Sequence, residues 1–146
     1  MRQNYSVYPA MIDGQAGIVW SYDNSQVTST FDSTHPVNVS TNNCDESHIC
    51  VWYVSPVWQF DDVLRTNYTL LGELDKWTTV SRQRFLSITT NTEKTQTTVV
   101  VQGVASETVQ VGVYHSSLGS TKVNCSISTA NGQANLVITP TSATCS

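Results

Sequence analysis

The sequence predicts an all-β protein, a two-sheet antiparallel β-sandwich of about nine or ten strands. Valine and threonine, two residue types that favour strands, occur 19 and 20 times among the 146 residues. Alternating or valine-rich runs recur along the chain with turn residues between them, and no segment sustains a helical period. The length fits one domain over residues 1–146, in which we expect residues 1–13 to be irregular.

The first predicted strands form a meander that follows a glycine turn. They cover residues 16–22, 26–31 and 37–40. The next strand, residues 48–57, carries apolar residues on both faces of its alternation, as a strand that is covered on both sides requires. We therefore predict that residues 48–57 form the central strand of the core.

The second half of the chain predicts further strands, with glycines at several of the turns between them. They cover residues 68–74, 84–90, 97–102, 108–115, 122–129 and 134–139. A short irregular piece around Trp77 separates the first two of these strands. We expect residues 97–102 to be an edge strand that other chains could pair with, because the strand carries no charge.

Charge and composition exclude several classes of function. Only 12% of the residues are charged, the net charge is −4 and the pI is near 5.1. Lysine and arginine form no cluster, so we expect no binding to nucleic acid or to an anionic membrane. The apolar runs are too short to span a bilayer, which predicts no membrane insertion. Serine and threonine together number 38, so hydroxyl groups must supply much of the polar surface.

Four cysteines predict two disulfides. Cys44 and Cys50 bracket a short loop that a local bridge could close, which leaves Cys125 to pair with Cys145. We predict this pairing among the three that are possible. A zinc site is the competing interpretation, but the chain has no Cys-x-x-Cys or His-x-x-x-His spacing, so no metal is predicted.

Four N-glycosylation sequons begin at Asn4, Asn38, Asn67 and Asn124. The period of two in a strand turns Asn38 and Asn124 away from their apolar neighbours, so both are expected to face solvent and to carry glycans. Together with the cysteines, the sequons predict an extracellular or secreted protein. Its signal peptide would lie outside this chain, because the N-terminal residues lack an apolar stretch.

Three parts of the chain carry a resemblance to a known family. Residues 14–22 read GQAGIVWSY after a glycine turn, and residues 37–57 form a valine-rich run that ends in VSPV. Residues 99–103, 111–117 and 122–125 read VVVQG, VGVYHSS and KVNC. In this order, the segments resemble the C-terminal β-sandwich of the raffinose synthase and alkaline α-galactosidase family. In that family the catalytic work is done in a preceding (β/α)8 barrel, whose aspartates have no counterpart here, so the resemblance implies an accessory domain.

Carboxylates and hydroxyls do not form a recognisable catalytic pattern. Asp61 and Asp62 follow Phe60 in a polar connection, where a turn role is more frequent than catalysis. The chain has no Gly-x-Ser-x-Gly nucleophile motif. We therefore predict that the protein is not an enzyme and needs no cofactor.

A local charge cluster stands out in this weakly charged chain. Glu73 and Asp75, two positions apart on a strand, would share one face. Lys76, and Arg82 or Arg84, are close enough in sequence to neutralise them. A structural ion-pair cluster is the favoured interpretation.

A carbohydrate-binding site needs an exposed aromatic ring for a sugar to stack on and polar groups for its hydroxyls. Trp77 is the best candidate because it lies outside any predicted strand, with Glu73 and Asp75 as polar neighbours. Trp58 is a second candidate ring, although core packing is the alternative for each of these side chains. Trp52 is expected in the core.

Two functions fit these observations. The first is a non-catalytic accessory or carbohydrate-binding domain related to a glycoside-processing enzyme. The alternative is a glycosylated structural subunit that assembles with copies of itself into an extracellular fibre or coat. The expected partners are therefore a carbohydrate or further copies of the chain.

Overall fold

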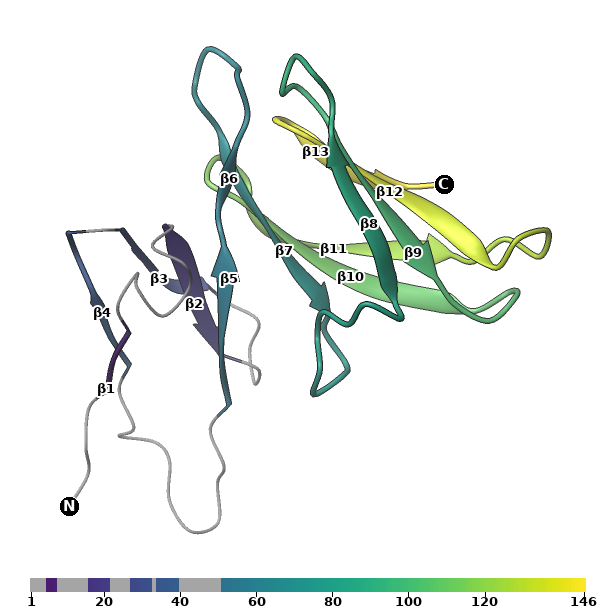
Figure 1. Cartoon of the computed structure of the whole chain (residues 1–146), viewed down its shortest axis with the longest axis horizontal. Helices are drawn as coiled ribbons and strands as arrows, with labels where there is room; N and C mark the ends of the chain where they lie inside the picture. The colour runs from purple at the N-terminus through teal and green to yellow at the C-terminus, as the bar shows by residue number, and fades with distance from the viewer. Residues whose placement is uncertain (1–4, 8–15, 22–26, 33, 40–50) are drawn as a thin grey trace, which may run out of the picture. The chain divides into compact units, whose positions relative to one another are not determined.

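A computed structural model describes residues 5–7, 16–21, 27–32, 34–39 and 51–146 of the chain (Figure 1). Every sheet in this part of the chain is antiparallel and no helix occurs in it, which confirms the all-β prediction. The chain divides into two compact units, residues 1–57 and residues 58–146. One domain over residues 1–146 stays a prediction.

The first unit contains two small sheets. Strands β2 (Gly17–Ser21), β3 (Val27–Phe31) and β5 (Trp52–Pro56) form one sheet in the order β3-β2-β5. Strands β1 (Tyr5–Val7) and β4 (Val37–Val39) form the other. The expectation of an irregular segment over residues 1–13 is corrected for residues 5–7 alone, because the backbone of β1 pairs with β4; the rest of that segment lies outside the described residues.

The prediction that residues 48–57 form the central strand is wrong. In the described part of its sheet β5 pairs with β2 alone, and Val54 is 36% exposed. The central strand is β2, in which Ile18 and Trp20 are fully buried and the Trp20 indole N–H donates to the Ser55 hydroxyl at 3.1 Å. Apolar residues on both faces indicate cover on both faces, but they do not say which strand has two strand neighbours.

Trp52, predicted in the core, is half-buried. It packs at the margin of a small cluster in which Val19 and Phe31 are buried.

The second unit is a β-sandwich of two four-stranded sheets that face each other (Figure 1). Sheet I has the order β11-β10-β7-β6, and sheet II has the order β13-β12-β9-β8. Their bounds are β6 Trp58–Gln59, β7 Asn67–Glu73, β8 Phe85–Thr90, β9 Thr97–Gln102, β10 Thr108–His115, β11 Gly119–Ser126, β12 Gln133–Thr139 and β13 Ser142–Cys145. Strands β9 and β10 have the predicted bounds, whereas the short strands β6 and β13 are additions to the prediction.

The prediction that residues 97–102 form an edge strand is also wrong. This strand, β9, is paired on one side with β12 and on the other with β8. Its alternate valines, Val99 and Val101, are fully buried in the core. The edge strands of sheet II are β8 and β13, and the side chains of β8 are exposed after Phe85.

The core of the sandwich comes from the inward faces of both sheets. Strand β10 contributes alternate valines to it from sheet I, and β9 and β12 contribute aliphatic residues from sheet II. The rings of Phe60 and Tyr68 stack with their centroids 4.1 Å apart. The Tyr68 hydroxyl reaches across to the hydroxyl of the buried Thr97 on β9, so this ring also ties sheet I to sheet II.

A disulfide closes one edge of the sandwich. Cys125 on β11 and Cys145 on β13 are bonded, with their Cα atoms 5.1 Å apart. Because β11 and β13 are edge strands of sheets I and II, the bond joins the two sheets directly. This confirms one of the two predicted bridges; Cys44 and Cys50 lie outside the described residues.

The sequon at Asn124 has the predicted orientation. Asn124 is exposed, whereas Cys125 is fully buried and Val123 packs against the core. Asn67 begins β7, is half-buried and accepts a hydrogen bond from the Gln59 amide at 3.1 Å. Asn4 and the side chain of Asn38 lie outside what the structure describes.

His115 is a polar side chain inside the sandwich. It is fully buried on β10, and its Nε2–H donates to the Thr139 carbonyl of sheet II at 3.0 Å. Its Nδ1 has no hydrogen-bond partner among the described residues. Burial disfavours the charged form and lowers the pKa of His115, so the ring is neutral in the folded protein.

Acid should therefore destabilise the sandwich through His115. The unfolded chain binds a proton on this ring below about pH 6.5, and the folded chain does so only at lower pH. Stability should fall as the pH drops from 7 to 5, by about 1.4 kcal/mol for each unit by which burial lowers the pKa. Urea unfolding across this range measures the effect.

His115→Gln should remove this part of the pH dependence, and His35→Gln serves as the control because His35 is exposed. Equal pH dependence in the wild type and His115→Gln would contradict the assignment.

Candidate functional site

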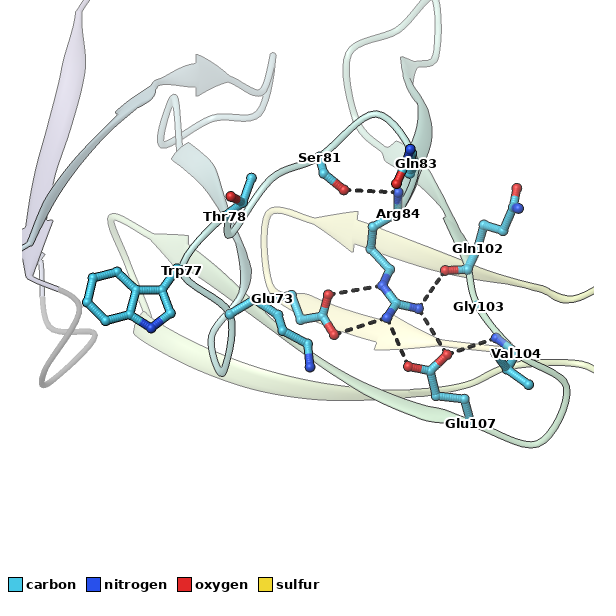
Figure 2. A pocket seen from close by; sticks show the side chains of 11 residues that line it. Glu73, Trp77, Thr78, Ser81, Gln83, Arg84, Gln102, Gly103, Val104 and Glu107 are labelled. Atoms are coloured by element: carbon cyan, nitrogen blue, oxygen red, sulfur yellow. Dashed lines mark hydrogen bonds and ion pairs between the residues drawn. The ribbon is translucent and has the colours of Figure 1, made fainter.

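An open pocket of about 770 Å³ lies at the end of the sandwich where the chain passes between the two sheets (Figure 2). Its walls come from the β7–β8 connection, residues 74–84, and the β9–β10 connection, residues 103–107. Both connections join sheet I to sheet II. The shape of the pocket therefore depends on the contacts that fix these two connections in place.

Gly72 allows the β7–β8 connection to fold back on its own strand. Gly72 has a φ of 90°, which L side chains rarely adopt, and a Cβ there would collide with the Thr79 carbonyl. The Glu73 N–H donates to the same carbonyl at 2.7 Å. The connection is thus fastened to the end of β7.

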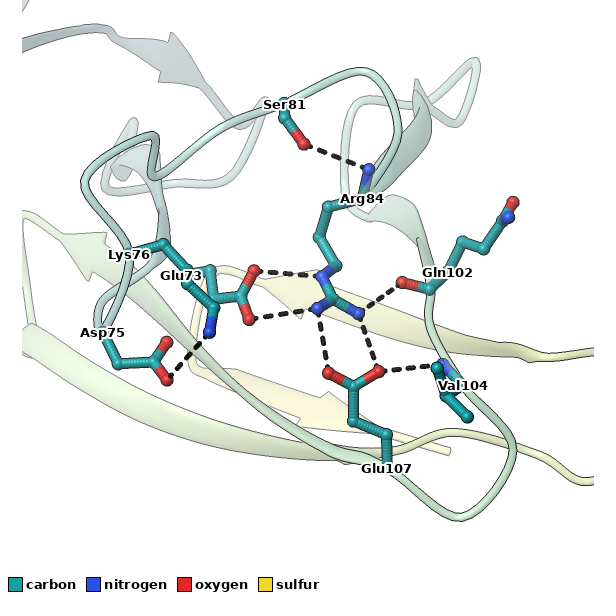
Figure 3. Close-up of polar contacts among 8 residues, drawn as sticks. All are labelled: Glu73, Asp75, Lys76, Ser81, Arg84, Gln102, Val104 and Glu107. Atoms are coloured by element: carbon teal, nitrogen blue, oxygen red, sulfur yellow. Dashed lines mark hydrogen bonds and ion pairs between the residues drawn. The ribbon is translucent and has the colours of Figure 1, made fainter.

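Arg84 lies at the floor of the pocket between two carboxylates (Figure 3). Its Nε and Nη2 donate to the two oxygens of Glu73 at 3.0 and 3.2 Å. Its Nη2 and Nη1 donate to the two oxygens of Glu107 at 2.9 and 3.0 Å. Nη1 also donates to the Gln102 carbonyl at 2.8 Å. All five N–H donors of the guanidinium are therefore used.

The cluster is largely shielded from water. The side chains of Glu73 and Arg84 are 8% and 17% exposed, and that of Glu107 is 31% exposed. The hydrogen bonds from Arg84, together with one from the Val104 N–H at 2.8 Å, lower the pKa of Glu107. The bonds to Glu107 in turn raise the pKa of Arg84. Arg84 and Glu107 are therefore both charged at neutral pH.

Gly103 leaves room for the cluster. A Cβ at this position would lie 2.7 Å from Arg84 Nη1 and would also collide with the Glu107 carboxylate. Any other residue there would push the ion pair apart.

Trp77 and Val104 form the exposed apolar parts of the pocket wall. Trp77 is 66% exposed and Val104 is 75% exposed. Figure 2 shows them on opposite sides of the pocket with the Arg84 cluster between them. Among the polar lining residues, Thr78 and Gln83 are exposed as well.

The structure brings some of the predicted site residues together. Trp77 and Glu73 both line the pocket. Glu73 forms the expected ion pair, and its partner is Arg84. Arg82, the other candidate partner, is exposed. Asp75 is not on the same strand face as Glu73, because β7 ends at Glu73 and turns.

The other two predicted residues do not line the pocket. Asp75 is exposed, with its carboxylate 3.8 Å from Lys76 Nζ. Trp58 lies on β6, half-buried, and its ring stacks on Tyr68. The alternative of core packing therefore holds for Trp58.

Glu107, Gly103 and Val104 are pocket residues that the sequence does not predict. The only local feature of the sequence at these positions is an acidic residue that follows a glycine turn. This feature does not indicate which cation pairs with the acidic residue. Glu107 is 23 positions from Arg84 in the sequence. The two side chains come into contact only because the two sheets pack against each other.

The acidic pair Asp61 and Asp62 has a turn role. Asp62 accepts hydrogen bonds from the Thr66 N–H and hydroxyl at 2.7 and 2.8 Å. Asp61 pairs with Arg65 across the same turn.

The described residues contain no group of three His, Cys, Asp or Glu side chains arranged as metal ligands. Within the same residues, no helix has the length and apolarity for crossing a membrane. No protein-family model, curated protein or solved structure matches the chain. The resemblance to the raffinose synthase family stays a prediction.

Removing Arg84 should destabilise the sandwich, because two partly buried carboxylates would lose their common partner. We expect Arg84→Met to lower the free energy of unfolding by about 2–3 kcal/mol, less than for a fully buried pair. Adding Glu73→Gln should recover part of this loss, since it removes one unpaired charge. Urea unfolding measures both.

Arg82→Met is the matched control, because Arg82 is exposed two positions away. A loss of similar size in Arg82→Met and Arg84→Met would argue against the cluster as a structural tie.

Proposed function

We propose that this chain is a non-catalytic extracellular β-sandwich that binds carbohydrate at the pocket beside Trp77. The observation that carries the proposal is a largely exposed tryptophan at an open polar pocket. An indole of this kind offers an apolar face on which a sugar ring can stack. In a weakly charged, hydroxyl-rich protein, this pocket suits a polar, uncharged ligand.

The construction of the pocket supports binding. The segment that carries Trp77 is fastened at Glu73 through the Thr79 carbonyl, so the ring is presented on a structured connection. Thr78 and Gln83 supply a hydroxyl and an amide beside the ring, and such groups can hydrogen-bond to sugar hydroxyls. Sugar recognition commonly combines an aromatic ring, on which the sugar can stack, with polar side chains that hydrogen-bond to the sugar hydroxyls.

The charges of the pocket support a non-catalytic role. A glycosidase needs one carboxyl group with a raised pKa to protonate the leaving oxygen. Both carboxylates of this pocket are bound by Arg84, and the pKa of Glu107 is lowered. Neither group is suited to act as a general acid.

An extracellular location is part of the proposal. The Cys125–Cys145 disulfide and the exposed sequon at Asn124 both agree with it. The resemblance to the C-terminal domain of the raffinose synthase family leads us to propose an accessory role beside a glycoside-processing enzyme.

Replacing Trp77 tests the proposal. In affinity electrophoresis with soluble galactomannan, xyloglucan and mixed-linkage β-glucan, we expect retardation by at least one polysaccharide. Trp77→Ala should weaken that binding about tenfold, which corresponds to about 1.4 kcal/mol, and Trp77→Phe should retain most of it. Because the side chain is largely exposed, circular dichroism should be unchanged. A wild-type protein that is not retarded by any glycan would overturn the proposal.

A second candidate function is self-association through β8. This edge strand has no charged side chain, and Leu86 and Ile88 are 45% and 42% exposed on it. The opposite edge of the sandwich is closed by the disulfide. An uncharged edge with exposed aliphatic residues can accept a strand from a second copy of the chain.

Sedimentation velocity tests this second candidate. If copies pair through β8, the wild type should form dimers or larger species as the concentration rises, and Ile88→Lys should stay monomeric. Val63→Lys is the control, because Val63 is 99% exposed in the turn between β6 and β7. A wild type that stays monomeric up to millimolar concentration would eliminate this function.

A further inference from the structure

We propose that the pocket beside Trp77 selects neutral glycans and rejects glycans that carry carboxylate or sulfate groups. This inference rests on the proposed carbohydrate binding and adds the class of ligand. It follows from the ion pairs that the charged residues of the pocket form with one another. Both cations among the described lining residues, Arg84 and Lys76, lie beside carboxylates of the chain itself.

Arg84 has no donor to offer to an acidic sugar. Proteins commonly recognise a carboxylate or sulfate through the fork of N–H groups on an arginine. In this pocket both sides of that fork are occupied, one by Glu73 and the other by Glu107, and the last N–H points to the Gln102 carbonyl. A ligand anion could bind Arg84 only by displacing one of the chain's own carboxylates.

Lys76 is the other cation among the described lining residues, and its charge is balanced too. Its Nζ lies 3.8 Å from the Asp75 carboxylate, with both side chains exposed to solvent (Figure 3). The charged residues that line the pocket are two cations, Lys76 and Arg84, and two carboxylates, Glu73 and Glu107. The lining residues therefore carry no net positive charge that could attract an anionic ligand.

The groups that remain for a ligand are uncharged or are acceptors. Glu107 is the more exposed carboxylate at the floor and has acceptor capacity beyond its bonds to Arg84 and Val104. Thr78 and Gln83 add a hydroxyl and an amide. A sugar hydroxyl can donate to Glu107, whereas a ligand carboxylate at the same place would set two like charges against each other.

Binding to matched neutral and acidic polysaccharides tests the inference. The probes are galactomannan, xyloglucan and mixed-linkage β-glucan, each before and after oxidation of its primary C6 hydroxyls to carboxylates. Affinity electrophoresis measures both forms at low and at high salt. We expect the wild type to bind the neutral form at least tenfold more tightly, with a smaller difference at high salt because salt screens the repulsion.

A charge variant locates the source of the discrimination. Glu107→Gln should reduce the preference for the neutral form severalfold, because the net charge of the lining residues rises from zero to +1 and Arg84 keeps an unbalanced charge. Glu93→Gln changes the net charge of the protein by the same amount at the opposite end of β8, and should leave the preference unchanged.

The outcomes separate the two proposals. Equal or tighter binding of the oxidised form would overturn the neutral selectivity and leave carbohydrate binding standing. An undiminished preference in Glu107→Gln would overturn the pocket charge as the source of the selectivity. No binding to either form of any probe would overturn both proposals.

Discussion

The ion pair cluster of Arg84 holds together a part of the sandwich that apolar packing leaves undefined. Glu73 ends β7 in sheet I, Arg84 precedes β8 in sheet II, and Glu107 precedes β10 in sheet I. One planar guanidinium with five fixed donors binds both acids and a carbonyl of β9. The cost of removing these charges from water is offset because every donor of the arginine has a partner. The two connections that line the pocket are thereby tied together at their ends.

The other polar ties between the sheets lie where the valine-rich core ends. The imidazole of His115 reaches the Thr139 carbonyl, and the Tyr68 hydroxyl reaches Thr97. The disulfide joins β11 to β13 along one edge. Small aliphatic residues fill the space between sheets but have little shape to set their register, so directional bonds are needed to specify one arrangement. At the β8 edge, the Tyr68 hydroxyl also lies 3.3 Å from the Thr90 hydroxyl.

The same cluster places charge at the floor of an open pocket. Glu73 and Glu107 both lie there, and each carboxylate is hydrogen-bonded to Arg84. Bound to one arginine, the two carboxylates share one cation as their partner. The site that we propose for carbohydrate is the exposed indole of Trp77 with its uncharged polar neighbours. The role of a carboxylate therefore depends on which cation binds it, and the tertiary structure is needed to identify that cation.

The sequence by itself determined the features that depend on local alternation. It placed most strands of the second unit, including β9 and β10, and it turned Asn124 outward beside the buried Cys125. It also predicted Trp77 outside the strands. Only the tertiary structure decided that β2 and β9 are interior strands, and that Glu107 meets Arg84 and Glu73. Alternation reports which face of a strand is covered, whereas strand order and contacts between distant residues depend on which sheets pair and pack.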